Sequence, residues 1–356
     1  MHWSPLIRTL KHSDRTIKKI KCKDNMTYPS QLQNEPSNSN INAQSSPLQV
    51  FRSNMQREIS KAVIGQHHII DAMLASLLVG GHILLEGPPG TAKTLLGNAF
   101  AKAIGGTFKR IQFSPDLLPS DVTGTITFRG NDLAFRQGPI FANIVLADEI
   151  NRTPPKTQSA LLEVMQEGQV TVDGNTHVLE KPFLVIATQN PIEFEGTYSL
   201  PEAQLDRFLI KATLTYPNPN EEFNVLKQPK DGLKNTAIDS ISPVVTFEEI
   251  FALQKQIESV MVTDEVMSYI VSLVIGTRHL PSVSLGASTR SAVHLLQVSK
   301  AFAAMSGRNY ATPDDIVNIA PAVLSHRLVL TPEAELDRFD SIKAINAVIQ
   351  STPIPK

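Results

Sequence analysis

The sequence predicts an α/β protein in which a five-stranded parallel sheet is covered by helices on both faces and is followed by an all-helical domain. The sheet is predicted because short apolar runs alternate with helical patterns, which is typical of parallel strands buried on both faces. The helical domain is predicted because strand signals largely stop beyond about residue 219, while helical patterns continue. The predicted strands are residues 82–86, 107–113, 143–148, 183–188 and 208–214.

Helices frame these strands, and two hairpins interrupt the alternation. Helical spacing predicts helices over residues 48–61, 66–79, 94–104 and 156–167. Alternating residues on either side of Gly130-Asn131-Asp132 predict one hairpin, and those on either side of Asp173-Gly174-Asn175 predict the other. Both central triplets contain good turn formers, which supports the assignment.

The chain divides into three parts. Residues 1–46 combine a basic stretch with a tract rich in Ser, Asn, Gln and Pro, and we expect disorder because such a segment cannot bury enough apolar surface. A basic amphipathic helix over residues 6–20 is the alternative, and translation from Met26 is a further hypothesis. Residues 47–218 form the predicted α/β domain. Residues 219–356 form the helical domain, with a capping box at Thr246 and further helices over residues 264–277, 289–306, 313–319 and 332–350.

Composition excludes several classes of protein. The chain has 356 residues, 42% of them apolar and 19% charged, which is ordinary for a soluble globular protein. The formal net charge is −1, so nothing global suggests binding to nucleic acid. Cys22 is the only cysteine, which excludes an intrachain disulfide and a cysteine-cluster metal site. We expect no transmembrane segment and no secretory signal peptide, and therefore a cytoplasmic protein.

The stretch "GPPGTAKT", residues 87–94, resembles a phosphate-binding loop of the form G-x-x-x-x-G-K-[ST]. It lies between a predicted buried strand and a predicted helix, as that motif requires. Backbone amides of residues 90–94 would face phosphates, Lys93 would reach the outer phosphates, and the Thr94 hydroxyl would bind Mg²⁺. Ala92 replaces the second glycine. We expect it to have a helical φ because it directly precedes the helical Lys93.

Two acidic residues follow the third predicted strand, in "NIVLADEINR". A phosphate-loop enzyme needs a carboxylate at the end of a neighbouring strand to hold Mg²⁺, and Asp148 suits this role. It also needs a group that positions the attacking water, and Glu149 suits that role. An acidic strand end in solvent is the alternative, which the upstream loop makes the poorer interpretation.

Four further polar residues are candidates for the same chemistry. Gln189 and Asn190 end the fourth strand, where they would orient water or sense the γ-phosphate, or would simply begin a turn before Pro191. Arg207, in "LPEAQLDRF", would neutralise charge in the transition state, although a lone arginine is usually a solvated charge. Arg290, in "GASTR", lies in the first turn of a helix, where a cation is unfavourable and an external anion is a plausible partner.

Taken together, the loop and the segments "LADEINR", "ATQNP", "LPEAQLDRF" and "GASTR" resemble the AAA+ ATPases, specifically those of the MoxR family. The resemblance covers roughly residue 48 to the C-terminus. Members of this family have "PG-x-AKT" in the loop, so Ala92 is a family feature. The N-terminal 46 residues have no counterpart in the family.

The resemblance implies a role for each matched residue. Asp148 and Glu149 correspond to the Walker B pair, Asn190 to the first sensor, Arg207 to the arginine finger that acts on a neighbouring subunit, and Arg290 to the second sensor. The catalytic residues are then Glu149, Lys93, Asn190, Arg207 and Arg290, and the Mg²⁺ ligands are Thr94 and Asp148. The implied nucleotide-binding residues, including the Walker A loop, are Val63, Ile64, Gly65, Gly87, Pro88, Pro89, Gly90, Thr91, Ala92, Lys93, Thr94, Leu95, Asp148 and Arg290.

The resemblance also implies an assembly and a partner. The family forms ring oligomers, commonly hexamers, that hydrolyse ATP and remodel or load metal into client proteins, often ones with a von Willebrand factor A domain. One alternative is a regulatory module that binds ATP as an assembly switch and hydrolyses it negligibly. A nucleic-acid motor is another, but the hairpins carry only Arg129 and Arg136, with Asp132 offsetting one of them.

Overall fold

The computed structural model describes residues 46–129, 132–190, 197–231 and 234–355. The disorder, helix and translation start predicted for the N-terminal leader therefore lie outside the described residues, apart from Ser46. So does the tip of the first hairpin, at residues 130–131. Residues Ser45–Lys356 form one compact unit.

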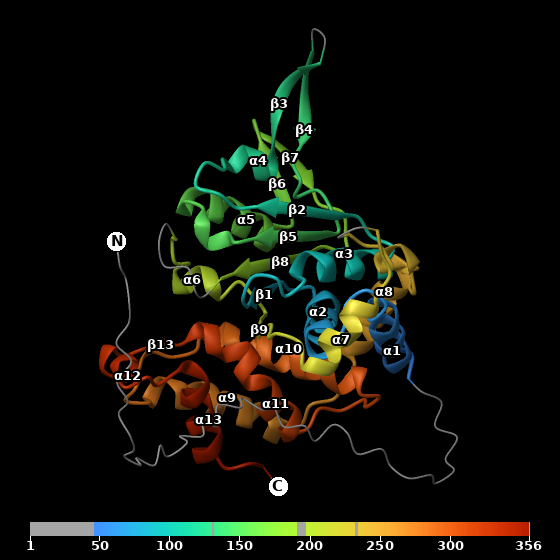
Figure 1. The fold of residues 1–356 in the computed structure, drawn as a ribbon. Coiled ribbons are helices and arrows are strands. Elements are labelled where there is room, and N and C mark those ends of the chain that lie inside the picture. The colour runs from blue at the N-terminus through green and yellow to red at the C-terminus, as the bar shows by residue number, and fades with distance from the viewer. Residues whose placement is uncertain (1–45, 130–131, 191–196, 232–233, 356) are drawn as a thin grey trace, which may run out of the picture. The chain divides into compact units, whose positions relative to one another are not determined.

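A five-stranded parallel sheet lies at the centre of this unit, as the sequence predicts (Figure 1). Its three middle strands consist almost wholly of buried apolar residues, because both of their faces are covered. The strands in spatial order are β2 (Phe108–Gln112), β5 (Ile144–Asp148), β8 (Leu184–Gln189), β1 (Ile83–Glu86) and β9 (Ile210–Thr213). All four neighbouring pairs are parallel, so the carboxyl ends of the strands meet at one edge of the sheet.

Alternate side chains of the strands enter two separate cores. Leu146 of β5 belongs to the first core, which includes residues of α1 (Pro47–Ile59), α2 (His67–Val79) and α3 (Lys93–Ala103). The next residue, Ala147, belongs to the second core, with α4 (Pro119–Thr123) and α5 (Pro155–Glu167). This alternation is the period-two pattern of a strand and explains why both faces are apolar.

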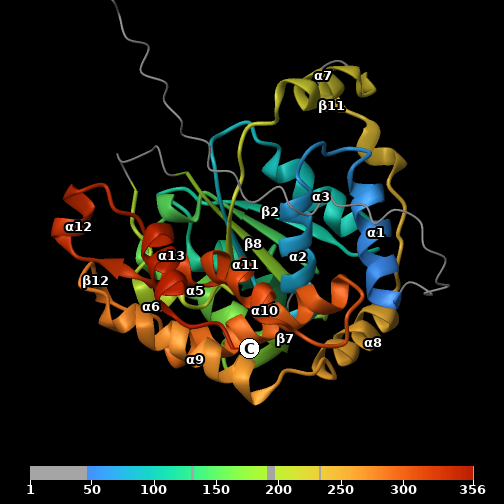
Figure 2. The ribbon, with the colours of Figure 1, turned by 90° about the horizontal axis from the view of Figure 1, so that it is seen from below.

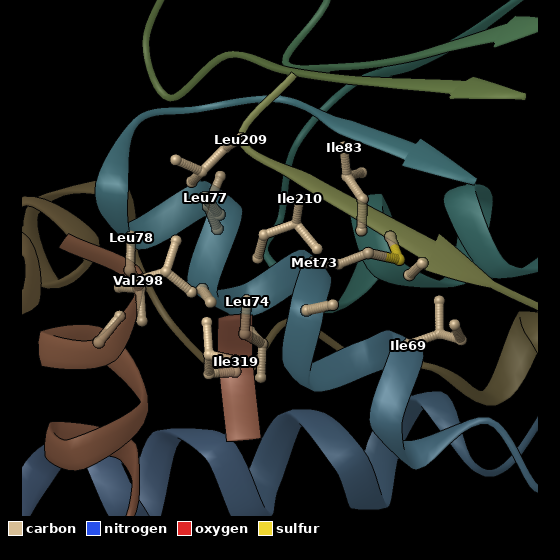
Figure 3. Packing of buried hydrophobic residues seen from close by; sticks show 14 of the residues in the cluster. Ile69, Met73, Leu74, Leu77, Leu78, Ile83, Leu209, Ile210, Val298 and Ile319 are labelled. Carbon is tan, nitrogen blue, oxygen red and sulfur yellow. The ribbon is translucent and has the colours of Figure 1, made fainter. Parts of the chain in front are cut away.

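The C-terminal helices pack on the first core. Figure 3 shows Leu74 and Leu78 of α2 beside Ile319 and Val298, which come from two C-terminal helices. Figures 1 and 2 show these helices on one side of the sheet. Residues on both sides of the boundary predicted at 218/219 share this core, and the boundary stays a prediction. The remaining helices are α6 (Glu202–Leu205), α7 (Pro219–Lys227), α8 (Phe247–Glu258), α9 (Asp264–His279), α10 (Thr289–Met305), α11 (Pro313–Leu324), α12 (Pro332–Leu336) and α13 (Ser341–Ser351).

Both predicted hairpins are present. The first pairs β3 (Gly124–Arg129) with β4 (Asp132–Gln137) and projects away from the sheet (Figure 1). The second pairs β6 (Gln169–Val172) with β7 (Asn175–Val178). Its two-residue loop has φ of 49° at Asp173 and 77° at Gly174, the positive values that a tight hairpin turn requires.

The single helix predicted over residues 332–350 is wrong, because the chain forms α12 and α13 instead. Arg338 has a φ of 55°, which ends helical geometry, and Phe339 N–H donates to the Ala334 carbonyl at 2.9 Å. The Asp340 side chain then accepts from Lys343 N–H at 2.8 Å and begins α13 as its N-cap. The predicted helical domain, residues 219–356, also contains two short strand pairs that the sequence did not predict. These are β10 (Lys230–Asp231) with β11 (Lys234–Asn235) and β12 (Val283–Leu285) with β13 (Val329–Leu330).

Candidate functional site

The loop between β1 and α3 brings backbone amides to the start of a helix. α3 begins at Lys93, and the preceding Ala92 has no side-chain oxygen to cap its first amides. The Thr91 hydroxyl donates to the Pro88 carbonyl at 3.0 Å, and Lys93 Nζ donates to the Gly87 carbonyl at 2.5 Å, so both side chains fold back on the loop. Uncapped amides and an amine at a helix N-terminus suit phosphate oxygens.

Ala92 does not have the helical φ that we expected. Its φ is 60° and its ψ is 27°, in the left-handed region, and Gly90 in the same loop has a φ of 81°. The prediction was wrong because Ala92 is the N-cap of α3, and an N-cap residue lies outside the helical run. A side chain in this conformation costs about 1 kcal/mol. Ala92 therefore carries backbone strain within the loop.

The carboxylate of Asp148 lies at the same edge of the sheet, at the end of β5. Its Oδ1 accepts from the Thr188 hydroxyl at 2.7 Å. Its Oδ2 accepts from Arg110 Nε at 3.0 Å and from Arg110 Nη2 at 2.6 Å. Sequence reasoning missed both partners. Thr188 could have been found, because it is a polar residue near the end of an apolar strand, whereas nothing in the sequence marked Arg110.

Glu149 directly follows β5 and is held by residues of two other segments. It has a φ of 57°, and its N–H donates to the Thr188 hydroxyl at 2.8 Å. Its Oε2 accepts from Gln112 Nε2 at 2.7 Å and lies 3.3 Å from Arg152 Nε. Thr188 therefore orients both acidic residues, since its hydroxyl accepts from the backbone of one and donates to the carboxylate of the other.

Electrostatics tie the loop to the two acids. Burial lowers the pKa of the Lys93 amine, and the nearby carboxylates of Asp148, Glu149 and Glu86 oppose that shift. The lysine therefore lies within electrostatic reach of the acids, as the proposed chemistry requires.

The donors at this edge fit a magnesium ion that shares its coordination with phosphate. The Thr94 hydroxyl and the Asp148 carboxylate are both oxygen donors, which Mg²⁺ prefers. Within the described ranges, no cluster of three His, Cys, Asp or Glu side chains could enclose a metal. Mg²⁺ commonly binds through one or two protein oxygens together with substrate phosphates, so this sparse donor set suits it.

Asn190 and the segment around Gly65 lie beside the loop. Asn190 is 7% exposed and follows the Gln189 end of β8, which pairs in register with Glu86. Gly65 has a φ of 78°, and a Cβ there would lie within 2.6 Å of the carboxylate oxygens of Glu221. Val63 is buried and Ile64 is half-buried. Gln66 Nε2 donates to the Thr215 carbonyl at 3.3 Å, which places the segment near the chain that leaves β9.

Arg207 and Arg290 lie together, at the opposite end of β1 from the loop. Both line a cavity of about 220 Å³ with residues 79–82, which lead into β1, and with His294 of α10. β1 has four residues, so its two ends are about 13 Å apart. Among the described residues that line this cavity, none is acidic. The structure thus separates the predicted site residues into two groups, one around the loop and one formed by Arg207 and Arg290. An anion would suit the group with the two arginines.

The chain matches models of two known domains. A model of the "ATPase family associated with various cellular activities (AAA)" matches residues 82–210, which contain the loop, both acids and Arg207. A model of the AAA lid domain matches residues 275–349, which contain Arg290. Among the described residues, no helix is long and apolar enough to cross a membrane.

Known proteins resemble most of the chain. The protein YeaC of Bacillus subtilis is 48% identical over 83% of this chain and 92% of its own length. The chaperone MoxR1 of Mycobacterium tuberculosis is 41% identical over 84% of this chain and 81% of its own. A crystal structure of a protein from Cytophaga hutchinsonii has a TM-score of 0.80 and 40% identity, covering 87% of this chain and 97% of that one.

Proposed function

The chain belongs to the MoxR family of AAA+ ATPases, and on this basis we propose that it binds ATP with Mg²⁺ at residues 87–94 and hydrolyses it to ADP and phosphate. The observation that carries the proposal is the convergence of the uncapped start of α3, the Lys93 amine and the two acids after β5 at one edge of the sheet. The chaperone relatives support a general AAA+ chaperone role.

In the bound state, the amides at the start of α3 receive the phosphates, with Lys93 at the outer ones. Thr94 and Asp148 would hold Mg²⁺, which would neutralise charge on the phosphate oxygens. Residues Val63–Gly65 flank the adenine. Asp148 Oδ2 accepts from Arg110 Nη2 at 2.6 Å, so Mg²⁺ would compete with this arginine for the carboxylate.

Hydrolysis depends on a water molecule that attacks the terminal phosphate. Glu149 positions this water and accepts its proton, and Asn190 at the end of β8 orients it. Thr188 holds the Glu149 backbone, while Gln112 and Arg152 set the direction of its carboxylate. The two latter contacts orient the carboxylate before ATP arrives.

The two arginines need a second subunit to take part. Because Arg207 and Arg290 lie at the end of β1 away from the loop, they would act on the nucleotide of a neighbouring molecule. An interface of this head-to-tail kind gives a ring where the rotation between subunits closes, and we propose a closed hexamer. We propose that the client is a protein with a von Willebrand factor A domain, and that the ring remodels it, matures it or loads it with metal. We also propose that the ring works in the cytoplasm.

ATP turnover of the full-length protein, measured against protein concentration beside Glu149→Gln, tests this proposal. We expect turnover per subunit to rise with concentration, because the site is shared. We expect Glu149→Gln to bind ATP without hydrolysing it, because the amide cannot accept the proton. Turnover per subunit that is independent of concentration would contradict the shared site.

One observation favours a second function, a regulatory switch that binds ATP and hydrolyses it negligibly. Both acids are engaged by basic side chains, Asp148 by Arg110 and Glu149 by Arg152. A protein that kept these pairs after binding ATP would assemble without turnover. Binding of ATP by both wild type and Glu149→Gln, with hydrolysis by neither at any concentration, would select this function.

A further inference from the structure

Arg327 is a buried arginine directly behind the segment that carries Arg207. It ends the short 3-10 helix Ser325–Arg327 after α11, and its side chain is 2% exposed. A buried charge needs compensating partners. Those of Arg327 lie on two other elements, the segment that enters β9 and the helix α10.

Arg327 contacts the residues on both sides of Arg207, through the side chain of Asp206 and the backbone carbonyl of Phe208. Arg327 Nη2 donates to the Phe208 carbonyl at 2.6 Å, and Arg327 Nε lies 3.3 Å from Asp206 Oδ1. His326 Nε2 donates to the same Phe208 carbonyl at 3.0 Å. Arg207 is therefore fixed through the residue before it and the residue after it.

The same guanidinium also contacts the helix that carries Arg290. Arg327 Nη2 donates to His294 Nδ1 at 2.6 Å, and His294 lies one turn after Arg290 on α10. Burial, and then the charges of Arg327 and Arg290, lower the pKa of His294 to about 3, so its ring is neutral and Nδ1 accepts. The hydroxyl of Ser288, the N-cap of α10, donates to Asp206 Oδ2 at 3.4 Å.

We propose that Arg327 is a positioning residue that holds Arg207 and Arg290 as one unit for the nucleotide of a neighbouring subunit. This inference rests on the proposed function. Arginine suits the role because one planar guanidinium reaches two elements at once, with Nη2 donating to Phe208 and His294 while Nε faces the Asp206 carboxylate. Displacing a catalytic group by about 1 Å can reduce a rate on the order of 100-fold, so the position of Arg207 matters even though Arg327 itself stays buried.

Steady-state ATP hydrolysis by Arg327→Met and Arg327→Lys in the full-length chain tests the proposal. We expect Arg327→Met to lower kcat on the order of 100-fold. We expect KM for ATP to change less than about two-fold, because the loop that binds ATP lies at the other end of β1. The kcat of Arg327→Lys, which keeps the charge and loses the planar guanidinium, is expected to lie between those of the wild type and Arg327→Met.

Two further measurements distinguish positioning from general damage. In the Arg207→Ala protein, the additional change Arg327→Met is expected to cause no further loss of kcat, because Arg327 acts through Arg207. Mixing Arg327→Met subunits with Lys93→Ala subunits is expected to restore ATP turnover. The Arg327→Met subunit keeps an intact phosphate-binding loop, and the Lys93→Ala subunit supplies a correctly held Arg207. A multiplicative loss in the double variant, or no recovery on mixing, would overturn the inference.

Arg308→Met is a control, because Arg308, like Arg327, pairs with an aspartate, in this case Asp315 at 2.6 Å. It follows α10, whose 17 residues span about 25 Å from the Arg290 end. We expect its kcat to stay near that of the wild type. If Arg327→Met does not fold, Asp206→Asn gives the same test, and unchanged kcat in that variant and in Arg327→Lys would overturn the inference. A wild type that does not hydrolyse ATP would instead contradict the proposed function.

Discussion

Two inactive variants are expected to restore ATP hydrolysis when they are mixed. Lys93→Ala removes the amine from the loop, and Arg207→Ala removes the cation at the opposite end of β1. The two positions are separated by the length of that strand, about 13 Å before side chains are added. In the proposed assembly, one active site takes its lysine and its arginine from different subunits, so each variant supplies the group that the other lacks.

The size of the recovery follows from this arrangement. A site is complete only where the loop of an Arg207→Ala subunit faces a Lys93→Ala neighbour. In a ring with head-to-tail interfaces and random mixing, this is true of about one quarter of the sites at equal proportions, whatever the number of subunits. The recovered turnover is expected to follow a symmetrical curve in the mixing ratio, with its maximum at equal amounts.

The assay is phosphate release at a fixed total subunit concentration over a series of mixing ratios. Each unmixed variant gives the baseline, and native mass spectrometry shows whether mixed oligomers form. Mixed oligomers without recovery at any ratio would refute the reasoning, because the loop and Arg207 would then serve the same molecule or the arginine would have no part in turnover. Activity of unmixed Arg207→Ala near the wild-type level would refute it as well.

Three further predictions concern the strained loop, the acid pair and a buried histidine. Ala92→Val is expected to lower the free energy of unfolding in urea by about 1–2 kcal/mol, because a β-branched side chain is poorly tolerated at positive φ. Ala92→Gly is expected not to lower it. Arg110→Met is expected to reduce the Mg²⁺ concentration for half-maximal hydrolysis about two- to five-fold, by freeing Asp148 from a half-exposed ion pair. His82 has its pKa lowered to about 4 by burial, so the unfolded chain binds a proton that the folded chain does not between about pH 6.5 and 4. The free energy of unfolding is expected to fall by about 3 kcal/mol across this window, and His82→Asn to lose that part of the pH dependence.

Each of these has an outcome that contradicts it. Equal stability of the alanine and valine proteins at position 92 would show that the loop relaxes without cost. An unchanged Mg²⁺ requirement in Arg110→Met would show that this ion pair does not compete with the metal. Equal pH dependence of unfolding in wild type and His82→Asn would show that the histidine is not held neutral by its burial.

The sequence by itself determined the sheet, both hairpins and most of the helices, because each depends on local periodicity and on turn residues. The loop with Lys93 and the acid pair after β5 were also predictable, since a short motif and a strand end specify them. The break between α12 and α13 was missed, although Asp340 is a good N-cap residue. Its signal competes with helical spacing that continues on both sides of it.

Only the tertiary structure decided how distant residues meet at the site. Thr188 joins Asp148 to Glu149 because parallel strands place their carboxyl ends at one edge, and Arg110 reaches the same carboxylate from a neighbouring strand. The left-handed backbone of Ala92 depends on the path of the whole loop and not on the residue that follows it. Arg207 and Arg290 share a cavity because the helical region packs against the segment that enters β9, and no spacing along the chain encodes that contact. A motif specifies residues that are neighbours in sequence, whereas the partners of a buried charge are chosen by packing in three dimensions.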